Sequence, residues 1–100
     1  FKGLNMFNVS IVNDGVKIVG ELIIDSYFFE PSKYDYAFYL YKDNEVVDKA
    51  WYSENKKVDF DLRGHGIYYI KVFIRDIEYD NKRTFISEKI ATTLNVSNDF

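Results

Sequence analysis

The stretch GHGIYYIKVFIRD, residues 64–76, carries the strongest fold signal in the sequence. Two glycines flank the only histidine, and two rows of side chains then alternate. One row contains Tyr68, Ile70, Val72 and Ile74, and the other contains Tyr69, Lys71, Phe73 and Arg75. Successive side chains of a strand point to opposite faces, so the purely apolar row predicts a buried face. We therefore predict that residues 64–66 form a turn that leads into a long strand.

The same two-residue period recurs along the rest of the chain, and no segment has a helical period. Predicted strands cover residues 7–11, 16–24, 34–42, 46–52, 58–62, 68–75 and 86–96. Turn signals lie at residues 13–15, 42–45, 53–56 and 78–82, and residues 25–34, which hold the only proline, form a connection. Seven short antiparallel strands separated by turns are typical of a sandwich of two sheets. We predict a single all-β domain over residues 1–100.

The alternation also predicts which side chains are buried. In residues 34–42 we place Tyr36, Phe38 and Leu40 inside, and Ala37, Tyr39 and Tyr41 outside. In residues 16–24 the inner row contains Val16, Ile18, Leu22 and Ile24. Gly20 interrupts that row, which indicates a bulge or a close approach of backbone to a neighbouring segment. Both rows of residues 46–52 contain apolar side chains, so the facing of Trp51 and Tyr52 stays open.

The composition excludes several classes of function. A net charge of −3 argues against a nucleic-acid-binding protein. The chain has no cysteine, which excludes disulfides, zinc sites with cysteine ligands and thiol nucleophiles. No apolar run approaches the roughly 20 residues that membrane insertion needs. Because the chain begins with Phe1 rather than Met and its first residues already follow a structured pattern, we expect a fragment of a larger multidomain protein.

The segment Gly66-Ile67-Tyr68-Tyr69-Ile70 resembles the tyrosine corner at the start of the F strand in immunoglobulin-like and fibronectin type III sandwiches. The resemblance implies a seven-stranded, antiparallel, immunoglobulin-like sandwich in which the Tyr68 hydroxyl bonds to backbone upstream. Gly66 would have a structural role before it. Ile70 stands where a disulfide-bearing domain has cysteine, with Leu22 as its expected apolar partner. Phe38 would replace the buried tryptophan of strand C.

A longer resemblance covers residues 34–76, YDYAFYLYKDNEVVDKAWYSENKKVDFDLRGHGIYYIKVFIRD. An aromatic strand, a K-D-x hairpin, W-Y-S, an apolar strand and then G-x-Y resemble the bacterial three-tyrosine (triple tyrosine motif) domain. That family accompanies sensor and surface-enzyme modules. The resemblance implies a non-catalytic accessory module of a larger bacterial protein, which packs against neighbours, spaces modules or binds partners. We expect it outside the cytoplasm or at the cell surface, with no cofactor.

Candidate catalytic and metal-binding residues are few. His65 lacks a nucleophile to activate, and its glycine neighbours favour an exposed turn, so we do not expect an enzyme. Asp76, Glu78 and Asp80 alternate in a predicted loop. A solvated turn is the favoured interpretation, with weak calcium binding left open. The sequons at Asn8 and Asn95 both lie in predicted strands, which lowers their value as glycosylation sites.

One feature exceeds what a generic sandwich needs, namely the aromatic residues of the outward rows. If the strands share a sheet, its outer face would carry Tyr39, Tyr41, Trp51 or Tyr52, Tyr69, Lys71, Phe73 and Arg75. Such a patch often marks an interaction surface. Cross-strand pairing that only stabilises the sheet is the alternative. For a docking surface, we expect a neighbouring domain or another protein as the partner before a carbohydrate.

Overall fold

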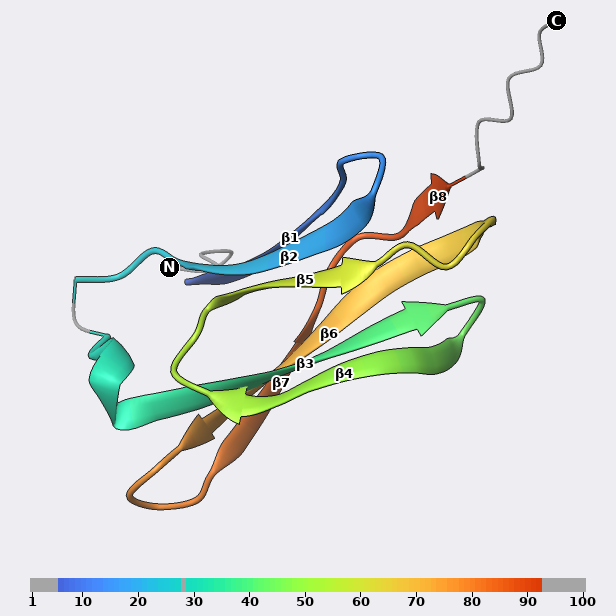
Figure 1. Cartoon of the computed structure of the whole chain (residues 1–100). Coiled ribbons are helices and arrows are strands. Elements are labelled where there is room, and N and C mark those ends of the chain that lie inside the picture. Colours follow the sequence, from blue (N-terminus) through green and yellow to red (C-terminus); the bar gives the residue numbers. More distant parts are fainter. Residues whose placement is uncertain (1–5, 28, 93–100) are drawn as a thin grey trace, which may run out of the picture.

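The computed structural model describes residues 6–27 and 29–92, which form β-strands and no α-helix (Figure 1). The strands are β1 (Phe7–Asn13), β2 (Lys17–Ile24), β3 (Tyr34–Lys42), β4 (Glu45–Ser53), β5 (Lys57–Asp61), β6 (Gly66–Asp76), β7 (Lys82–Ile86) and β8 (Ile90–Thr92). A short 3-10 helix, Pro31–Lys33, lies in the connection between β2 and β3. The all-β prediction is therefore confirmed for the described residues.

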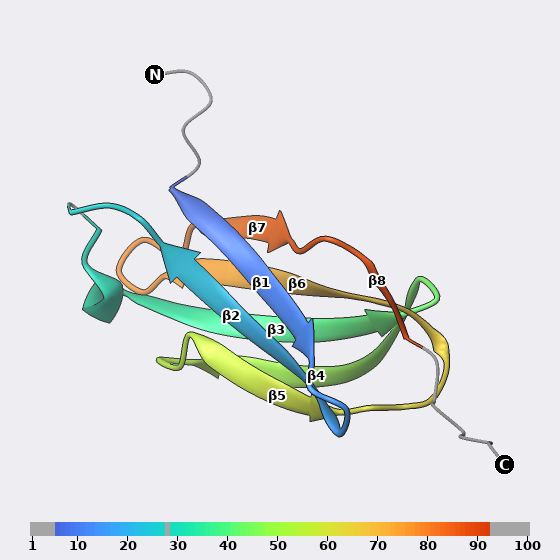
Figure 2. The same cartoon turned by 90° about the horizontal axis from the view of Figure 1, so that it is seen from above.

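The strands form two antiparallel sheets. The smaller sheet has the order β1-β2-β5, and the larger sheet has the order β4-β3-β6-β7, with β8 also paired to β6. Figure 2 shows the smaller sheet lying over the larger one, with its strands crossing at an angle. In the larger sheet, the register of β3 against the edge strand β4 shifts twice, between Tyr36 and Phe38 and between Leu40 and Tyr41.

The last predicted strand, residues 86–96, is wrong in its extent. Strand β7 begins at Lys82, and the chain leaves the regular ladder before β8, so eight strands rather than seven are present among the described residues. Ser87 explains the break, because its N–H donates to the Ile70 carbonyl at 2.8 Å while its Oγ accepts from the Ile70 N–H at 2.9 Å. A side chain thus replaces one backbone acceptor. Leu94 and Val96 lie outside the described residues.

The core lies between the two sheets and contains the predicted inner rows. The larger sheet contributes Tyr36, Phe38, Leu40, Tyr68, Ile70, Val72 and Ile74, and the smaller sheet contributes Phe7, Ile11, Ile18, Leu22 and Phe60. These side chains come from both halves of the sequence and bury each other. Burial of a large apolar side chain contributes about 1.5–3 kcal/mol, so this cluster is the main stabilising feature of the domain.

One facing prediction, for Val16, is wrong for a local reason, and one outward residue, Ala37, is buried. Val16 lies in the turn before β2 and is 71% exposed, because the Asp14 carboxylate accepts hydrogen bonds from the N–H groups of Val16 and Lys17. Ala37 lies in the outward row of β3 but is fully buried. It is a small side chain directly opposite Phe73, and larger neighbours on the same face cover it.

Gly20 marks a close approach between the sheets rather than a bulge. It pairs in regular register with Ile11 on one side and Val58 on the other. A Cβ atom placed on Gly20 would collide with the Cδ1 atom of Ile70. Gly20 of β2 therefore lies against Ile70, and Leu22, the partner that the resemblance suggested, belongs to the same core as Ile70.

The start of β6 is fixed by the hydroxyl group of Tyr68. This hydroxyl donates to the Gly64 carbonyl at 2.7 Å and accepts from the Arg63 N–H at 3.0 Å. Gly64 has a φ of 84°, a left-handed conformation that glycine adopts without strain. A Cβ atom on Gly66 would lie 2.8 Å from the Lys42 side chain, so this position also favours glycine. The hydrogen bonds predicted for Tyr68 are confirmed.

Candidate interaction surface

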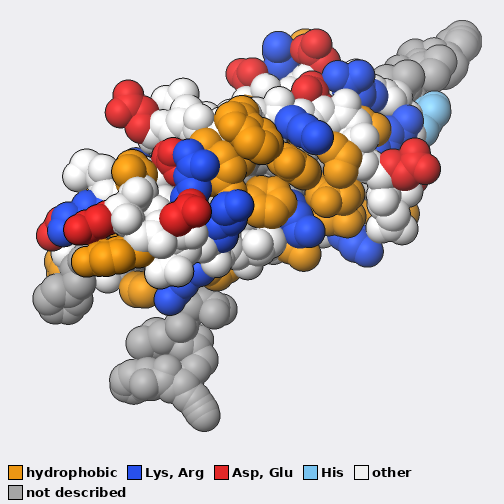
Figure 3. All heavy atoms as spheres, turned by 90° about the horizontal axis from the view of Figure 1, so that it is seen from below, with side chains coloured by type: hydrophobic (Ala, Val, Ile, Leu, Met, Phe, Trp, Pro, Cys, Tyr) orange, Lys and Arg blue, Asp and Glu red, His pale blue; other side chains and the backbone are white. Residues whose placement is uncertain are grey.

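The outer face of the larger sheet, which points away from the core, carries a group of hydrophobic side chains with Lys and Arg side chains among them (Figure 3). Residues directly opposite each other on antiparallel strands point to the same face of the sheet, so the register shows which outward side chains are neighbours. Tyr41 pairs with Tyr69, Tyr39 with both Lys49 and Lys71, Ala37 with Phe73, and Asp35 with Arg75. The predicted outward residues of β3 and β6 are therefore brought together on one surface.

A bulge in β4 settles the facing of Trp51 and Tyr52. The register shift gives β4 one residue more than β3 at this point, so both side chains lie opposite Ala37. Their rings meet edge to face at a centroid distance of 5.3 Å. Trp51 is 65% exposed, whereas Tyr52 is half-buried. Both residues join the outer face, which the alternating pattern alone did not determine.

The aromatic rings of β3 and β6 form two cross-strand pairs. Tyr41 and Tyr69 stack with ring centroids 4.6 Å apart and an interplanar angle of 6°. Tyr39 and Phe73 are 4.8 Å apart at an angle of 59°. Each ring is therefore restrained by contact with the other ring of its pair. Such aromatic pairs stabilise a fold by about 0.5–1.5 kcal/mol beyond the effect of burial alone.

Lysine side chains lie over these rings. Lys71 Nζ is 5.7 Å from the Tyr41 ring centroid and 5.6 Å from that of Phe73. Lys49 Nζ is 5.0 Å from the Tyr39 ring, and Lys89 Nζ is 5.5 Å from the Tyr69 ring. We name this surface the aromatic–lysine face; it comprises Tyr39, Tyr41, Lys49, Trp51, Tyr52, Tyr69, Lys71, Phe73 and Lys89.

Lys49 and Lys89 were not predicted from the sequence. Lys49 belongs to the strand whose facing was ambiguous, and its place follows only from its pairing with Tyr39. Lys89 lies in the connection between β7 and β8, where no alternating pattern gives a direction. Tertiary contacts, not a local motif, place both lysines on the face.

Arg75 lies in the outward row, as the pattern predicts, and it also supports the surface. Its guanidinium makes two hydrogen bonds to the Asp35 carboxylate, at 3.0 and 2.7 Å, and lies 4.0 Å from the Tyr52 ring centroid. The hydrogen bond to Asp35 raises the pKa of Arg75, and burial raises the pKa of the Tyr52 hydroxyl. Arg75 therefore stays charged and positions Tyr52.

The other predicted candidates do not assemble into a site. His65 is exposed in the turn before β6. One carboxylate oxygen of Asp76 accepts hydrogen bonds from the N–H groups of Glu78 and Tyr79, so it stabilises the turn. Within residues 6–27 and 29–92, no three His, Asp or Glu residues lie close enough to hold a metal ion. Asn8 is exposed on β1, and Asn95 lies outside the described residues.

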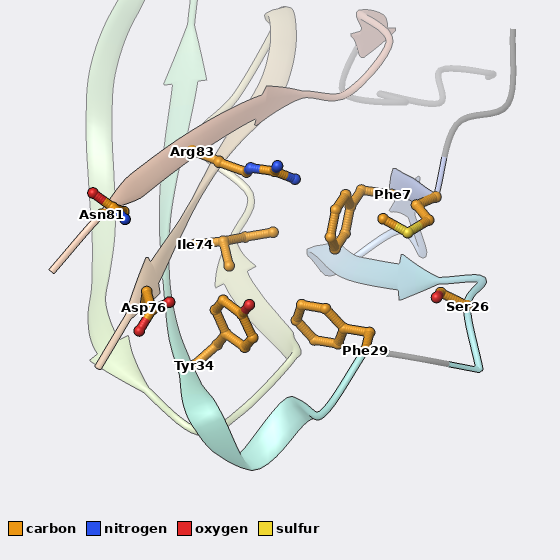
Figure 4. A pocket seen from close by; sticks show the side chains of 9 residues that line it. Phe7, Ser26, Phe29, Tyr34, Ile74, Asp76, Asn81 and Arg83 are labelled. Carbon is orange, nitrogen blue, oxygen red and sulfur yellow. The ribbon is translucent and has the colours of Figure 1, made fainter. Parts of the chain in front are cut away.

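A pocket of about 340 Å³ lies at one end of the core (Figure 4). It is lined by Met6, Phe7, Ser26, Phe29, Tyr34, Ile74, Asp76, Asn81 and Arg83. The Phe29 ring stacks on Tyr34 at 4.4 Å and meets Phe7 edge to face at 5.3 Å. Arg83 extends toward Phe7, 5.9 Å from its ring. The sequence carries no local signal for this hollow, because its walls come from distant segments.

Comparison of the sequence with known protein families finds no match, and comparison with curated proteins finds none either. In the part of the chain that the structure describes, no helix is long and apolar enough to cross a membrane.

Proposed function

We propose that this domain is an immunoglobulin-like sandwich that serves as a non-catalytic accessory module of a larger bacterial protein. The strand orders β1-β2-β5 and β4-β3-β6-β7 support this proposal, because they correspond to an A-B-E sheet and a C′-C-F-G sheet. The two hydrogen bonds of the Tyr68 hydroxyl also support it, since they reproduce a tyrosine corner at the start of strand F. The resemblance of residues 34–76 to the three-tyrosine domain points the same way.

The aromatic–lysine face is the proposed contact surface, and its partner is a neighbouring domain or another protein. Cross-strand pairing alone accounts for Tyr41 with Tyr69 and for Tyr39 with Phe73. It does not account for Trp51, which is 65% exposed beside these pairs. Tyrosine and tryptophan are enriched among the residues that dominate binding energy in protein interfaces. The exposed Trp51 at the edge of an ordered aromatic surface is the observation that carries the proposal.

A carbohydrate is the second candidate ligand, favoured by the same exposed Trp51. A sugar ring stacks on the open face of an aromatic ring, and most of the aromatic rings on this surface are covered. Tyr41 and Tyr69 cover each other, and lysine ammonium groups lie over Tyr39, Tyr69 and Phe73. We therefore expect no change in Trp51 fluorescence when a panel of neutral glycans is titrated into the protein. A saturable change with one glycan would favour the carbohydrate function over the protein partner.

The protein-partner proposal predicts the effect of the double change Tyr69→Ala and Phe73→Ala. Removal of both rings should weaken association with the neighbouring segments of the parent protein at least tenfold, or about 1.4 kcal/mol. Isothermal titration calorimetry between separately produced segments measures this. Ile23→Ala is the matched control, because Ile23 is 45% exposed on the smaller sheet. If the wild type and the double variant bind with equal affinity, the aromatic rings only stabilise the sheet and the face is not the contact surface.

A further inference from the structure

We infer that the partner of the aromatic–lysine face is a protein surface that presents Asp and Glu carboxylates. This inference rests on the proposed function and specifies its partner. Lys49, Lys71 and Lys89 each lie over an aromatic ring. Within the described part of the chain, none of the three ammonium groups forms a salt bridge with a carboxylate. The face therefore offers positive charge that the described residues leave without a counter-ion.

The charge of this face is opposite to that of the whole protein. The sequence has a net charge of −3. Asp35 is the only acid in the outward rows of β3 and β6, both of which are fully described, and it is paired with Arg75. Three other cations, Lys17, Lys33 and Arg63, also have carboxylate partners. Three lysines without an ion pair to a described residue thus lie together where the aromatic rings gather, and an acidic partner complements them.

The rings hold the lysines in place before any partner arrives. The ammonium groups lie 5.0 to 5.7 Å from ring centroids, within the range of cation–π attraction. The rings in turn are fixed by contacts with each other. A lysine that is already ordered loses less side-chain entropy when it pairs with a carboxylate, which favours binding.

The sheet also sets the spacing of the charges. Lys49 and Lys71 both pair with Tyr39, from the strands on either side of it, so their backbones are about 10 Å apart. Two carboxylates with this separation occur on one face of a helix or on alternate strands of a sheet. Because the lysines cover the ring faces, a carboxylate at the end of a flexible side chain fits this surface better than a stacked sugar ring does.

The inference is tested by titration of the whole chain with poly-L-glutamate at low salt, followed by NMR chemical shifts. We expect saturable shifts confined to the aromatic–lysine face, which weaken as salt is added. The triple change Lys49→Gln, Lys71→Gln and Lys89→Gln should weaken binding about tenfold. The matched control is Lys33→Gln, Lys56→Gln and Lys57→Gln, which changes the net charge equally but lies away from the face. Thermal unfolding of each variant checks that the fold is kept.

Three results would overturn the acidic-protein inference: no saturable binding of poly-L-glutamate, equal weakening in both triple variants, or tighter binding of polygalacturonate. The last result would assign the face to an acidic polysaccharide. None of them decides whether the face is a contact surface at all, because the double change Tyr69→Ala and Phe73→Ala tests that separately. Selective weakening by the face triple variant, with poly-L-glutamate bound more tightly than polygalacturonate, supports the inference.

Discussion

Replacement of Tyr68 by Phe is expected to lower the free energy of unfolding by about 2 kcal/mol. The ring stays buried in the core, so the change removes only the hydroxyl group. That hydroxyl makes two hydrogen bonds, one to the Gly64 carbonyl and one from the Arg63 N–H. Both backbone groups lose their partner in a partly buried turn, and this costs more than the loss of an exposed hydrogen bond. Urea denaturation followed by fluorescence measures the difference.

The neighbouring residue provides the control for this prediction. Tyr69 has the same side chain, but it lies on the outer face and its hydroxyl makes no hydrogen bond to another described residue. Tyr69→Phe should therefore change stability by less than about 0.5 kcal/mol. Equal losses in the two variants would show that the hydroxyl bonds of Tyr68 do not stabilise the turn.

Gly20→Ala is expected to destabilise the domain by about 2 kcal/mol, although glycine in a strand is usually unfavourable. A glycine-to-alanine change at a compatible site stabilises a protein by about 0.4–1 kcal/mol. Here the new Cβ would collide with Cδ1 of Ile70, which is fully buried in the core between the sheets. Overpacking between the two sheets should therefore reverse the usual sign. Thermal and urea unfolding of the variant measure this effect.

A second change provides the decisive comparison. Ile70→Val deletes the Cδ1 atom that the alanine would meet, and alone it should cost about 1 kcal/mol. In the double variant the alanine methyl fills the space that this deletion opens. The double variant should consequently be at least as stable as Ile70→Val alone. The effects of the two substitutions on the free energy of unfolding would then be strongly non-additive, with the double variant more stable than their sum predicts. If the two losses in stability simply add, the alanine methyl group does not compete with Ile70 Cδ1 for space, and the sheets move apart to accommodate it.

The parts of the fold that follow from local alternation were predictable from the sequence. The range Tyr34–Lys42 matches β3 at both ends, and the inner row that begins at Tyr68 is buried throughout. In these strands each side chain's direction is set by the residue before it. The hydroxyl bonds of Tyr68 were also predictable, since a resemblance of a few residues implies a specific local geometry.

Features that depend on pairing between strands were not predictable in the same way. Trp51 and Tyr52 share a face only because β4 has an extra residue opposite β3. Ala37 is buried because of neighbours on other strands, and Lys89 reaches Tyr69 from a connection with no period of its own. An alternating pattern describes one strand only. It does not show the register of the partner strand or where a bulge places an extra residue opposite.

The irregular pairing of β4 is a feature that opposes aggregation through the edge of the larger sheet. Strand β4 is an edge of the larger sheet, and its register against β3 shifts twice. A flat, regular edge strand is a template onto which the strand of another molecule adds, whereas bulges and a lysine such as Lys49 oppose that addition. The domain can therefore expose the aromatic–lysine face while the adjoining edge strand resists the addition of strands from other molecules. The proposed association would then depend on side chains, which discriminate between partners, and not on the exposed backbone of β4, which does not.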